Sequence, residues 1–151
     1  MVQIKKASIE DLDSLVQLFD KYRMFYKNPS DIENAKKFIS ARITKNDAEI
    51  FICFNDENMA VGFVQLYPLF SSTRMQKLWL LNDLYIDEHH RGEGYSIKLI
   101  DKAKELCKLT NACGLILETS KENTVGNNLY TKTGFRLDNE HNYYSWNNEP
   151  N

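Results

Sequence analysis

An arginine, two glycines and a serine stand together in HHRGEGYSIKLI, residues 89–100, directly before an apolar-periodic run. The chain has only six glycines, so two of them one residue apart indicate a special backbone conformation at this point. Backbone amides at a helix N-terminus have no partner inside the helix, and the helix dipole there favours an anion. Glycines let the backbone approach a bulky anion, and the arginine fork suits phosphate oxygens. Segment 91–96 is therefore either a diphosphate-binding turn or an ordinary tight turn with a solvated arginine.

A second unusual feature is the polar pair Asn82–Asp83, which interrupts the otherwise apolar run KLWLLNDLYI. An apolar run of this kind predicts a strand buried in the middle of a sheet. Burying a carboxylate there is unfavourable unless a partner or a bound cation compensates the charge. Asp83 is therefore either a functional carboxylate or a structural residue that pairs with an internal amide.

Composition and charge exclude several classes of protein. The 151 residues are 42% hydrophobic and 26% charged, which fits one globular domain with one hydrophobic core. The formal net charge is −2 and the pI is near 5.9, so no overall basic field attracts nucleic acid. No apolar run approaches the roughly 20 residues of a membrane span, and the N-terminus has no signal-like apolar region. We expect a single cytoplasmic domain over residues 1–151 that binds neither nucleic acid nor membranes.

Cysteine and histidine usage predicts no metal site. Cys53, Cys107 and Cys113 are odd in number and lack CxxC spacing, so reduced, buried thiols are expected. His89 and His90 are adjacent and would point to opposite sides of an extended segment. We expect no metal.

Hydrophobic periodicity predicts an α/β (mixed α+β) chain in the order β-α-α-β-β-β-α-β-α-β-β. Strands are expected for VQIKKA, EIFICF, AVGFVQLY, KLWLLNDLYI, GLILET, FRLDN and NYYSW. Helices are expected from Ser8 to Phe25, from Ser30 to Lys45, from Ser96 to Thr110 and from Val125 to Thr133. The prediction is a mixed, mostly antiparallel central sheet flanked by helices, which the last two strands close as an antiparallel pair.

Two motifs resemble those of the GNAT superfamily, the acetyl-CoA-dependent N-acetyltransferases. RGEGYS at 91–96 resembles the R-x-x-G-x-G/A signature of that superfamily, and the strand LNDLYI resembles the one that precedes it. NTVGNNLYTKTGF at 123–135 resembles the segment N-x-x-A-x-x-L-Y-x-K-x-G-F, at the expected distance. Ser96 stands where Gly or Ala is usual, and Gly126 where Ala is usual. The resemblance implies a GNAT-like fold and acetyl-CoA as co-substrate.

By that resemblance, the loop before the third helix holds the CoA pyrophosphate. Backbone amides of the central strand would bind the pantetheine arm and polarise the thioester carbonyl. Asn123 would either contact the arm or cap the last helix. The implied contacts with acetyl-CoA are Leu84, Tyr85, Ile86, Arg91, Gly92, Glu93, Gly94, Tyr95, Ser96 and Asn123.

The resemblance also implies two catalytic residues. Tyr130 is the candidate general acid, because a phenol with a pKa of about 10 can pass a proton to a departing thiolate; the alternative is a core tyrosine. An alkylamine with a pKa of about 10.4 is protonated at neutral pH, so some group must accept its proton. Asp83 is the candidate that orients the amine or accepts that proton. Asn82 replaces the first of two tandem acids found in the spermidine/spermine branch, which leaves the base open.

The segment between the first two helices usually lines the acceptor site in this superfamily. Here it carries Phe25 and Tyr26, whose rings could hold an ammonium group, and Tyr67 could add another wall; a core role explains them equally. The pattern YRMFY, followed later by LNDLYIDE, resembles the branch of that superfamily that acetylates polyamines and exposed protein lysines. With Asn82 and Asp83, this resemblance implies that the chain acetylates a small (poly)amine. The alternatives are a protein lysine or N-terminal amine, or a non-catalytic acyl-CoA sensor. Homodimers are common in this superfamily, and the aromatic tail HNYYSW is the candidate interface.

Overall fold

The computed structural model describes residues 1–149 of the chain. The chain forms two compact units, Met1–Glu118 and Thr119–Asn151, and each is described by itself. The expectation of one domain over residues 1–151 stays a prediction.

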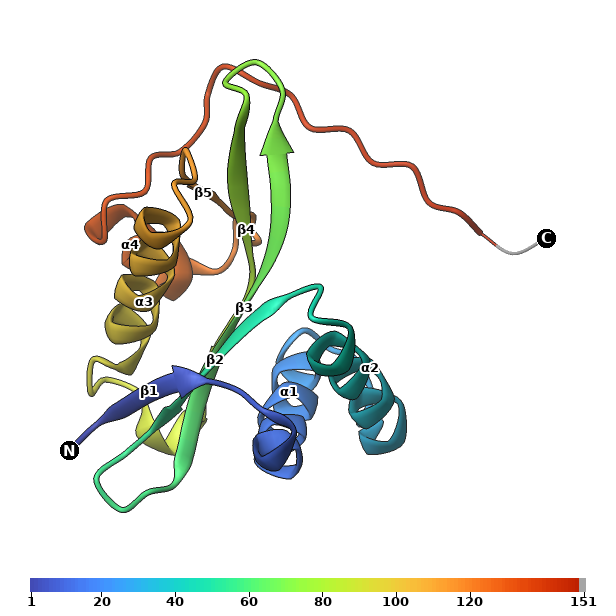
Figure 1. Cartoon of the computed structure of the whole chain (residues 1–151), viewed down its shortest axis with the longest axis vertical. Coiled ribbons are helices and arrows are strands. Elements are labelled where there is room, and N and C mark those ends of the chain that lie inside the picture. The colour runs from blue at the N-terminus through green and yellow to red at the C-terminus, as the bar shows by residue number, and fades with distance from the viewer. Residues whose placement is uncertain (150–151) are drawn as a thin grey trace. The chain divides into compact units, whose positions relative to one another are not determined.

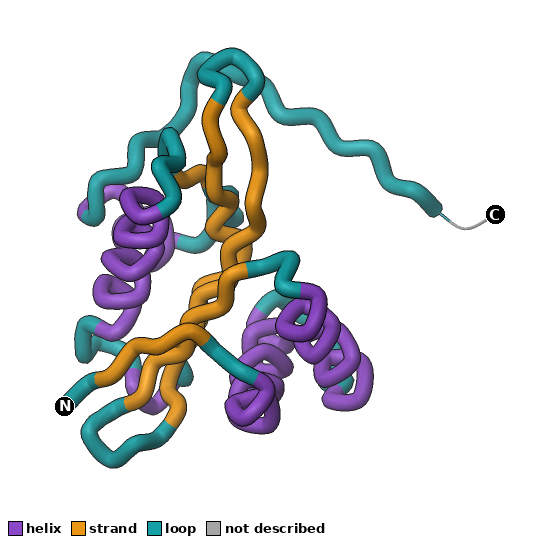
Figure 2. The backbone as a smooth tube through the Cα atoms, viewed as in Figure 1, coloured by secondary structure: helices purple, strands orange, loops and turns teal. Residues whose placement is uncertain are grey.

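The first unit is built on a five-stranded sheet in the order β1-β2-β3-β4-β5. The strands are β1 (Gln3–Lys6), β2 (Glu49–Phe54), β3 (Ala60–Ser71), β4 (Gln76–Ile86) and β5 (Leu115–Ile116). All neighbouring pairs are antiparallel except β4 and β5, which run parallel. The helices are α1 (Leu12–Phe25), α2 (Ile32–Lys45) and α3 (Tyr95–Leu109). Helices α1 and α2 lie on one side of the strands and α3 on the other (Figures 1 and 2), which gives the predicted mixed sheet flanked by helices.

Helix starts follow from side-chain chemistry, with one difference from prediction. Ser8 and Asp11 form a capping box, and a short 3₁₀ turn at Ile9–Asp11 precedes α1. Helix α2 begins after Asp31, whose carboxylate accepts the amide of Asn34 at 3.2 Å, and not at Ser30 as expected. The Ser30 hydroxyl instead donates to the buried Asp20 carboxylate at 2.6 Å. That bond fixes the loop between α1 and α2.

A bulge in β4 decides which side chains face α1. Gln65 of β3 pairs with Asp83, but the next residue, Leu66, pairs with Leu81, so Asn82 has no partner on β3. Because side chains alternate along a strand, one extra residue moves everything beyond it to the other face. The bulge therefore turns Asp83 towards the side of the sheet that α1 covers.

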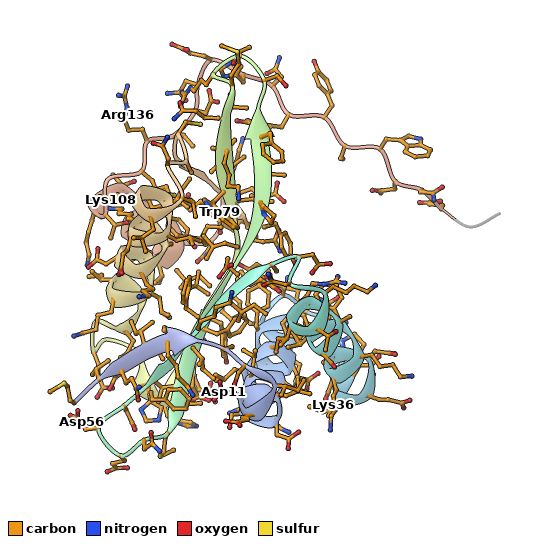
Figure 3. All side chains as sticks on the ribbon, in the orientation of Figure 1. Asp11, Lys36, Asp56, Trp79, Lys108 and Arg136 are labelled. Atoms are coloured by element: carbon orange, nitrogen blue, oxygen red, sulfur yellow. The ribbon has the colours of Figure 1, made fainter. Side chains whose placement is uncertain are left out.

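Before the bulge, Trp79 and the other side chains on its face of β4 point towards α3. The indole of Trp79, labelled in Figure 3, donates to the Thr110 hydroxyl at 2.9 Å just past α3. Trp79 and Leu80 also form the whole of the pairing with β5, opposite Leu115 and Ile116. The expected strand GLILET is therefore limited to two residues, and β4 beyond Leu80 pairs only with β3.

The second unit contains helix α4 (Thr124–Lys132). Its N-cap is Asn123, whose side-chain oxygen accepts the amide of Gly126 at 3.1 Å, one of the two roles predicted for Asn123. A Cβ on Gly126 would lie 2.4 Å from the side-chain Nδ2 of Asn123. Glycine at this position therefore makes room for the cap.

The two closing strands, FRLDN and NYYSW, were predicted wrongly. Residues 135–149 contain neither helix nor strand. Asp138 accepts the amides of Glu140 at 2.8 Å and His141 at 3.1 Å, and the Tyr143 hydroxyl at 3.0 Å. Such local side-chain bonds compete with sheet pairing, and β-propensity alone supplies no partner strand.

Candidate active site

The turn before α3 has the backbone that its glycines suggested. Gly92 and Gly94 have φ values of +80° and +85°, in the left-handed region that favours glycine. An added Cβ would meet no atom within 4 Å at either position, so the space beside the turn is open. No side chain caps α3, Ser96 included. The first amides of a 15-residue helix and an open glycine turn thus fit a diphosphate group.

Arg91 lies against the end of β4. Its Nε donates to the carbonyl of Ile86 at 3.0 Å, and its guanidinium lies 5.4 Å from the ring centres of Phe25 and Tyr85. Phe25, predicted as a contact for a substrate ammonium, already has a cation beside its ring. The Tyr95 side chain is buried, so any contact of Tyr95 with a ligand in the turn is made by its backbone. Glu93 approaches His90 at 3.9 Å.

The β4 segment around Leu84 and Ile86 lies beyond the last residue that pairs with β5. One edge of its backbone is therefore not used by a neighbouring strand, as an extended ligand arm would require. On the other edge, Gly62 of β3 packs closely, because a Cβ there would lie 2.8 Å from the carbonyl oxygen of Tyr85. The position of this segment is thus fixed from the β3 side.

Asp83 is 5% exposed, and neutral amides hold both its oxygens. Gln65 donates its Nε2 to Oδ2 at 2.6 Å, and Asn82 donates its Nδ2 to Oδ1 at 3.0 Å. No lysine, arginine or histidine among residues 1–149 forms an ion pair with it. The Oε1 of Gln65 is buried without a hydrogen-bond donor in the described part of the chain. The pairing with an internal amide is present, and no cation of the described chain pairs with the carboxyl group.

Asp87, just past β4, has the cation that Asp83 lacks. Lys21 of α1 approaches its carboxylate at 2.6 Å, and the carboxylate also accepts the amide of His89 at 3.0 Å. The hydrogen bond from Lys21, opposed by burial, lowers the pKa of Asp87, and the same bond raises the pKa of Lys21. This pair fastens α1 to the end of β4, next to the glycine turn.

An aromatic cluster joins the α1 end to β4. Tyr22 packs edge to face against Tyr26 at 5.1 Å, Phe63 at 5.9 Å and Tyr85 at 6.2 Å between ring centres. The Tyr22 hydroxyl donates to the carbonyl of Asn82, at the bulge, over 3.4 Å. Phe25 and Tyr26 are about half exposed, so the structure brings both predicted acceptor-site rings beside the β4 end.

Sequence reasoning missed Tyr22 and Gln65 as site residues. Tyr22 lies at an apolar position of its helical run, which by itself indicates a core residue. Gln65 had a visible signal, since it is the one strongly polar residue of AVGFVQLY. A lone amide in a buried strand indicates a polar partner on the neighbouring strand, which here is Asp83.

Tyr130 and Asn123 belong to the second unit. The Tyr130 ring packs edge to face against Phe135 at 5.7 Å. Asn123 also donates its Nδ2 to the Thr119 hydroxyl at 3.0 Å. Their roles towards acetyl-CoA stay predictions.

The described part of the chain contains neither a cluster that could hold a metal ion nor a helix that could span a membrane. No three or more His, Cys, Asp or Glu side chains gather where they could hold a metal ion. No helix is both long enough and apolar enough to span a membrane.

Comparison with known proteins identifies the class. The acetyltransferase (GNAT) family profile matches residues 12–135. The uncharacterized N-acetyltransferase YhfO of Bacillus subtilis is 34% identical over 137 residues, 91% of each chain. A probable acetyltransferase of Haemophilus influenzae is 29% identical over 136 residues, 90% of this chain and 91% of that protein. The crystal structure of a probable acetyltransferase superposes with a TM-score of 0.93 at 35% identity, covering 99% of both chains.

The chain belongs to the GNAT acetyltransferase family. The predicted fold class and enzyme class, an N-acetyltransferase, are thereby confirmed. The family uses acetyl-CoA, and the contacts predicted for it in the turn before α3 and in the β4 segment stay predictions.

Proposed function

We propose that this acetyltransferase acetylates a small primary amine whose ammonium group is recognised at Asp83. The observation that carries the proposal is a buried carboxylate that has no cation in the described chain and lies beside the donor-free Oε1 of Gln65. Burying such a charge is unfavourable without a partner. An amine substrate supplies both the cation for Asp83 and a donor for Gln65.

The residues around the proposed site have separate roles in acetyl transfer. When bound, acetyl-CoA supplies the thioester; the amine nitrogen forms the new C–N bond to its carbonyl carbon, and the C–S bond breaks. The turn at Gly92 and Gly94, with the first amides of α3, would hold the diphosphate. Amides at 84–86 would stabilise negative charge on the carbonyl oxygen. Asp83 orients the amine and takes up the proton that it loses, directly or through water.

Tyr130 is the proposed general acid. Its phenol donates a proton to the departing thiolate, and the second proton that the nitrogen loses, once the C–N bond has formed, returns to the phenolate through water. Free CoA thiol and the N-acetyl amine are then the products. Binding acetyl-CoA alone needs no such acid, which favours an enzyme over a sensor.

The Tyr130→Phe variant separates these two functions. We expect kcat to fall about 100-fold while the affinity for acetyl-CoA, measured by calorimetry, stays the same. Unchanged turnover would remove Tyr130 from the mechanism. Binding of acetyl-CoA without turnover in the parent protein, on any amine, would favour the sensor.

The acceptor class is proposed from the same site. A small amine suits a carboxylate that is 5% exposed and held by Gln65 and Asn82, because a protein lysine must bring its backbone to the surface nearby. The sequence motifs favour polyamines among small amines, and a protein lysine or N-terminal amine is the alternative. Rates on spermidine and on a lysine-rich peptide compare the two directly.

A homodimer is proposed through the C-terminal tail. Tyr143, Tyr144 and Trp146 are 78%, 90% and 84% exposed, and residues 135–149 form no strand. Exposed aromatic rings on a short segment favour burial against a partner, and β5 leaves a sheet edge open to one. Sedimentation should give a dimer that the triple variant Tyr143→Ser, Tyr144→Ser, Trp146→Ser converts to a monomer. A monomeric parent protein at micromolar concentration contradicts the proposal.

A further inference from the structure

An open pocket lies on the face of the sheet that carries Asp83. Its volume is about 310 Å³, and it is lined by Phe38 and Arg42 of α2, by Asp47 shortly after α2, and by Tyr67 of β3. Tyr67 follows Gln65 by two residues along β3, so the two side chains share a face. The cavity therefore lies on the same face of β3 as Gln65, the partner of Asp83, one side-chain position further along the strand.

Arg42 is held in a fixed orientation at this cavity. Its Nε lies 2.9 Å from the Asp47 carboxylate, and its guanidinium lies 4.8 Å above the Phe38 ring. The same Nε forms no aligned hydrogen bond, so the contact with Asp47 is a charge pairing of poor geometry. Among residues 1–149 the Arg42 guanidinium forms no hydrogen bond, ion pair or ring contact besides these two. Its two terminal nitrogens are therefore available to a ligand in the cavity.

Tyr67 supplies a second donor. Burial, and then the negative charge of Asp83, raise the pKa of Tyr67 to about 12, so the hydroxyl stays protonated at neutral pH. No hydrogen bond of this hydroxyl occurs within residues 1–149. The influence of Asp83 on Tyr67 places the cavity within electrostatic reach of the proposed amine site.

We propose that this cavity binds a carboxylate group of the acceptor, through the Arg42 guanidinium and the Tyr67 hydroxyl. A guanidinium and a phenol match the oxygens of a carboxylate, and Phe38 packs against the aliphatic part of the ligand. The preferred acceptor is then an amine that also carries a carboxylate, such as a free amino acid. This inference rests on the proposed amine site at Asp83. Within the class of small primary amines proposed for that site, it favours amino acids over the polyamines that the sequence motifs favour.

The charge of the cavity separates this class from polyamines. A second ammonium group would approach Arg42 and be repelled, whereas a carboxylate is attracted. The negative charge of Asp47 offsets part of that attraction. However, the Asp47 side chain is 46% exposed and the Arg42 side chain 21%, so water screens the charge of Asp47 more strongly. The cavity therefore discriminates between amines by the charge at their far end.

Lysine and cadaverine test the inference, because they differ only in the carboxylate. Calorimetric titration in the absence of acetyl-CoA should show lysine binding about 10–100-fold more tightly than cadaverine. In thiol-release assays with acetyl-CoA, lysine should have the lower KM by a similar factor, with similar kcat. Equal affinities for the two amines would overturn the inference even if neither is acetylated.

Variants locate the effect. Arg42→Gln should remove the preference for lysine and leave binding of cadaverine unchanged or stronger, and Arg42→Lys should keep part of it because a point charge remains. Tyr67→Phe should weaken lysine binding severalfold. Lys45→Gln, an exposed residue in the last turn of α2, is the matched control and should change nothing.

Two failures are distinguishable. Acetylation of cadaverine and lysine at the same kcat/KM leaves the amine site intact and removes the carboxylate site. Tight, Arg42-dependent binding of lysine without any acetylation keeps the carboxylate site and contradicts the proposed function.

Discussion

Asp83 and Asp87 lie four residues apart and are almost equally buried, at 5% and 7% exposure, but their partners are of opposite kinds. Asp87 meets the ammonium group of Lys21 at 2.6 Å. Asp83 meets only the neutral amides of Gln65 and Asn82. Both carboxylates sit where α1 covers the sheet, so burial alone does not separate them.

The difference indicates which charge is structural and which is functional. A buried carboxylate paired with a cation of its own chain is complete in the folded protein. One held in place by neutral amides keeps its charge for an external cation, and its two oxygens are already oriented. Asp87 thus stabilises the frame that holds the glycine turn, and Asp83 is the carboxylate that we propose for substrate binding.

Replacing Asp83 by Asn should have the largest effect on activity. The variant keeps the volume and can keep the contact with Gln65, since an amide can exchange donor and acceptor roles with it. We expect kcat/KM for the amine to fall about 100-fold, with little change in thermal stability. The measurement is initial-rate thiol release alongside thermal unfolding.

The matched control is Asp87→Asn, which should show the opposite pattern. Loss of the ion pair with Lys21 should cost about 2 kcal/mol, which lowers Tm by about 4–8 °C in a chain of this size. Half of the Lys21 side chain is exposed, so solvent screening keeps the loss below that of a fully buried pair. If Asp87→Asn abolishes activity at unchanged stability, the two aspartates have been assigned the wrong way round.

Acid pH should remove the difference in free energy of unfolding between the parent protein and Asp87→Asn. The hydrogen bond from Lys21 lowers the pKa of Asp87 in the folded protein. Its stabilisation is therefore present above the unfolded pKa of about 3.9 and is lost as pH falls through the lower, folded pKa. Denaturant unfolding at a series of pH values should show the stability gap narrowing below about pH 4. A gap that stays constant down to pH 2 would contradict the ion-pair account.

Tyr22→Phe should have the smallest effect. The variant keeps the aromatic packing and removes the long hydrogen bond to the carbonyl of Asn82. The expected loss is about 0.5 kcal/mol of stability, with a slight fall in kcat/KM if the bulge relaxes around Asp83. A large loss of activity would show that the bulge depends on this hydroxyl more than the distance of 3.4 Å suggests.

The sequence predicted site residues best where the signal lay in a few consecutive residues. The glycines and arginine of 91–96 identified the start of α3, because positive φ values and helix amides are properties of a few consecutive residues. Asp83 stood out because a charge interrupted an apolar strand. Its partner Gln65 was missed because pairing between strands depends on a register that a single bulged residue, Asn82, resets.

Longer-range features were harder to predict. NYYSW has strand-forming residues, but no sheet register fixes a partner for it, and local bonds to Asp138 compete. The cavity between α2 and β3 brings Arg42 and Tyr67 together from segments 25 residues apart, about which periodicity says nothing. Such a site becomes visible only once the helix is packed on the sheet.

The most direct test of the central claim is the rate of CoA thiol release from acetyl-CoA over a panel of small primary amines, measured for the parent protein and for Asp83→Asn. The account predicts saturable turnover on at least one amine, which falls about 100-fold in the variant. Turnover that Asp83→Asn leaves unchanged, or a parent protein that binds acetyl-CoA but acetylates no small amine, would contradict it.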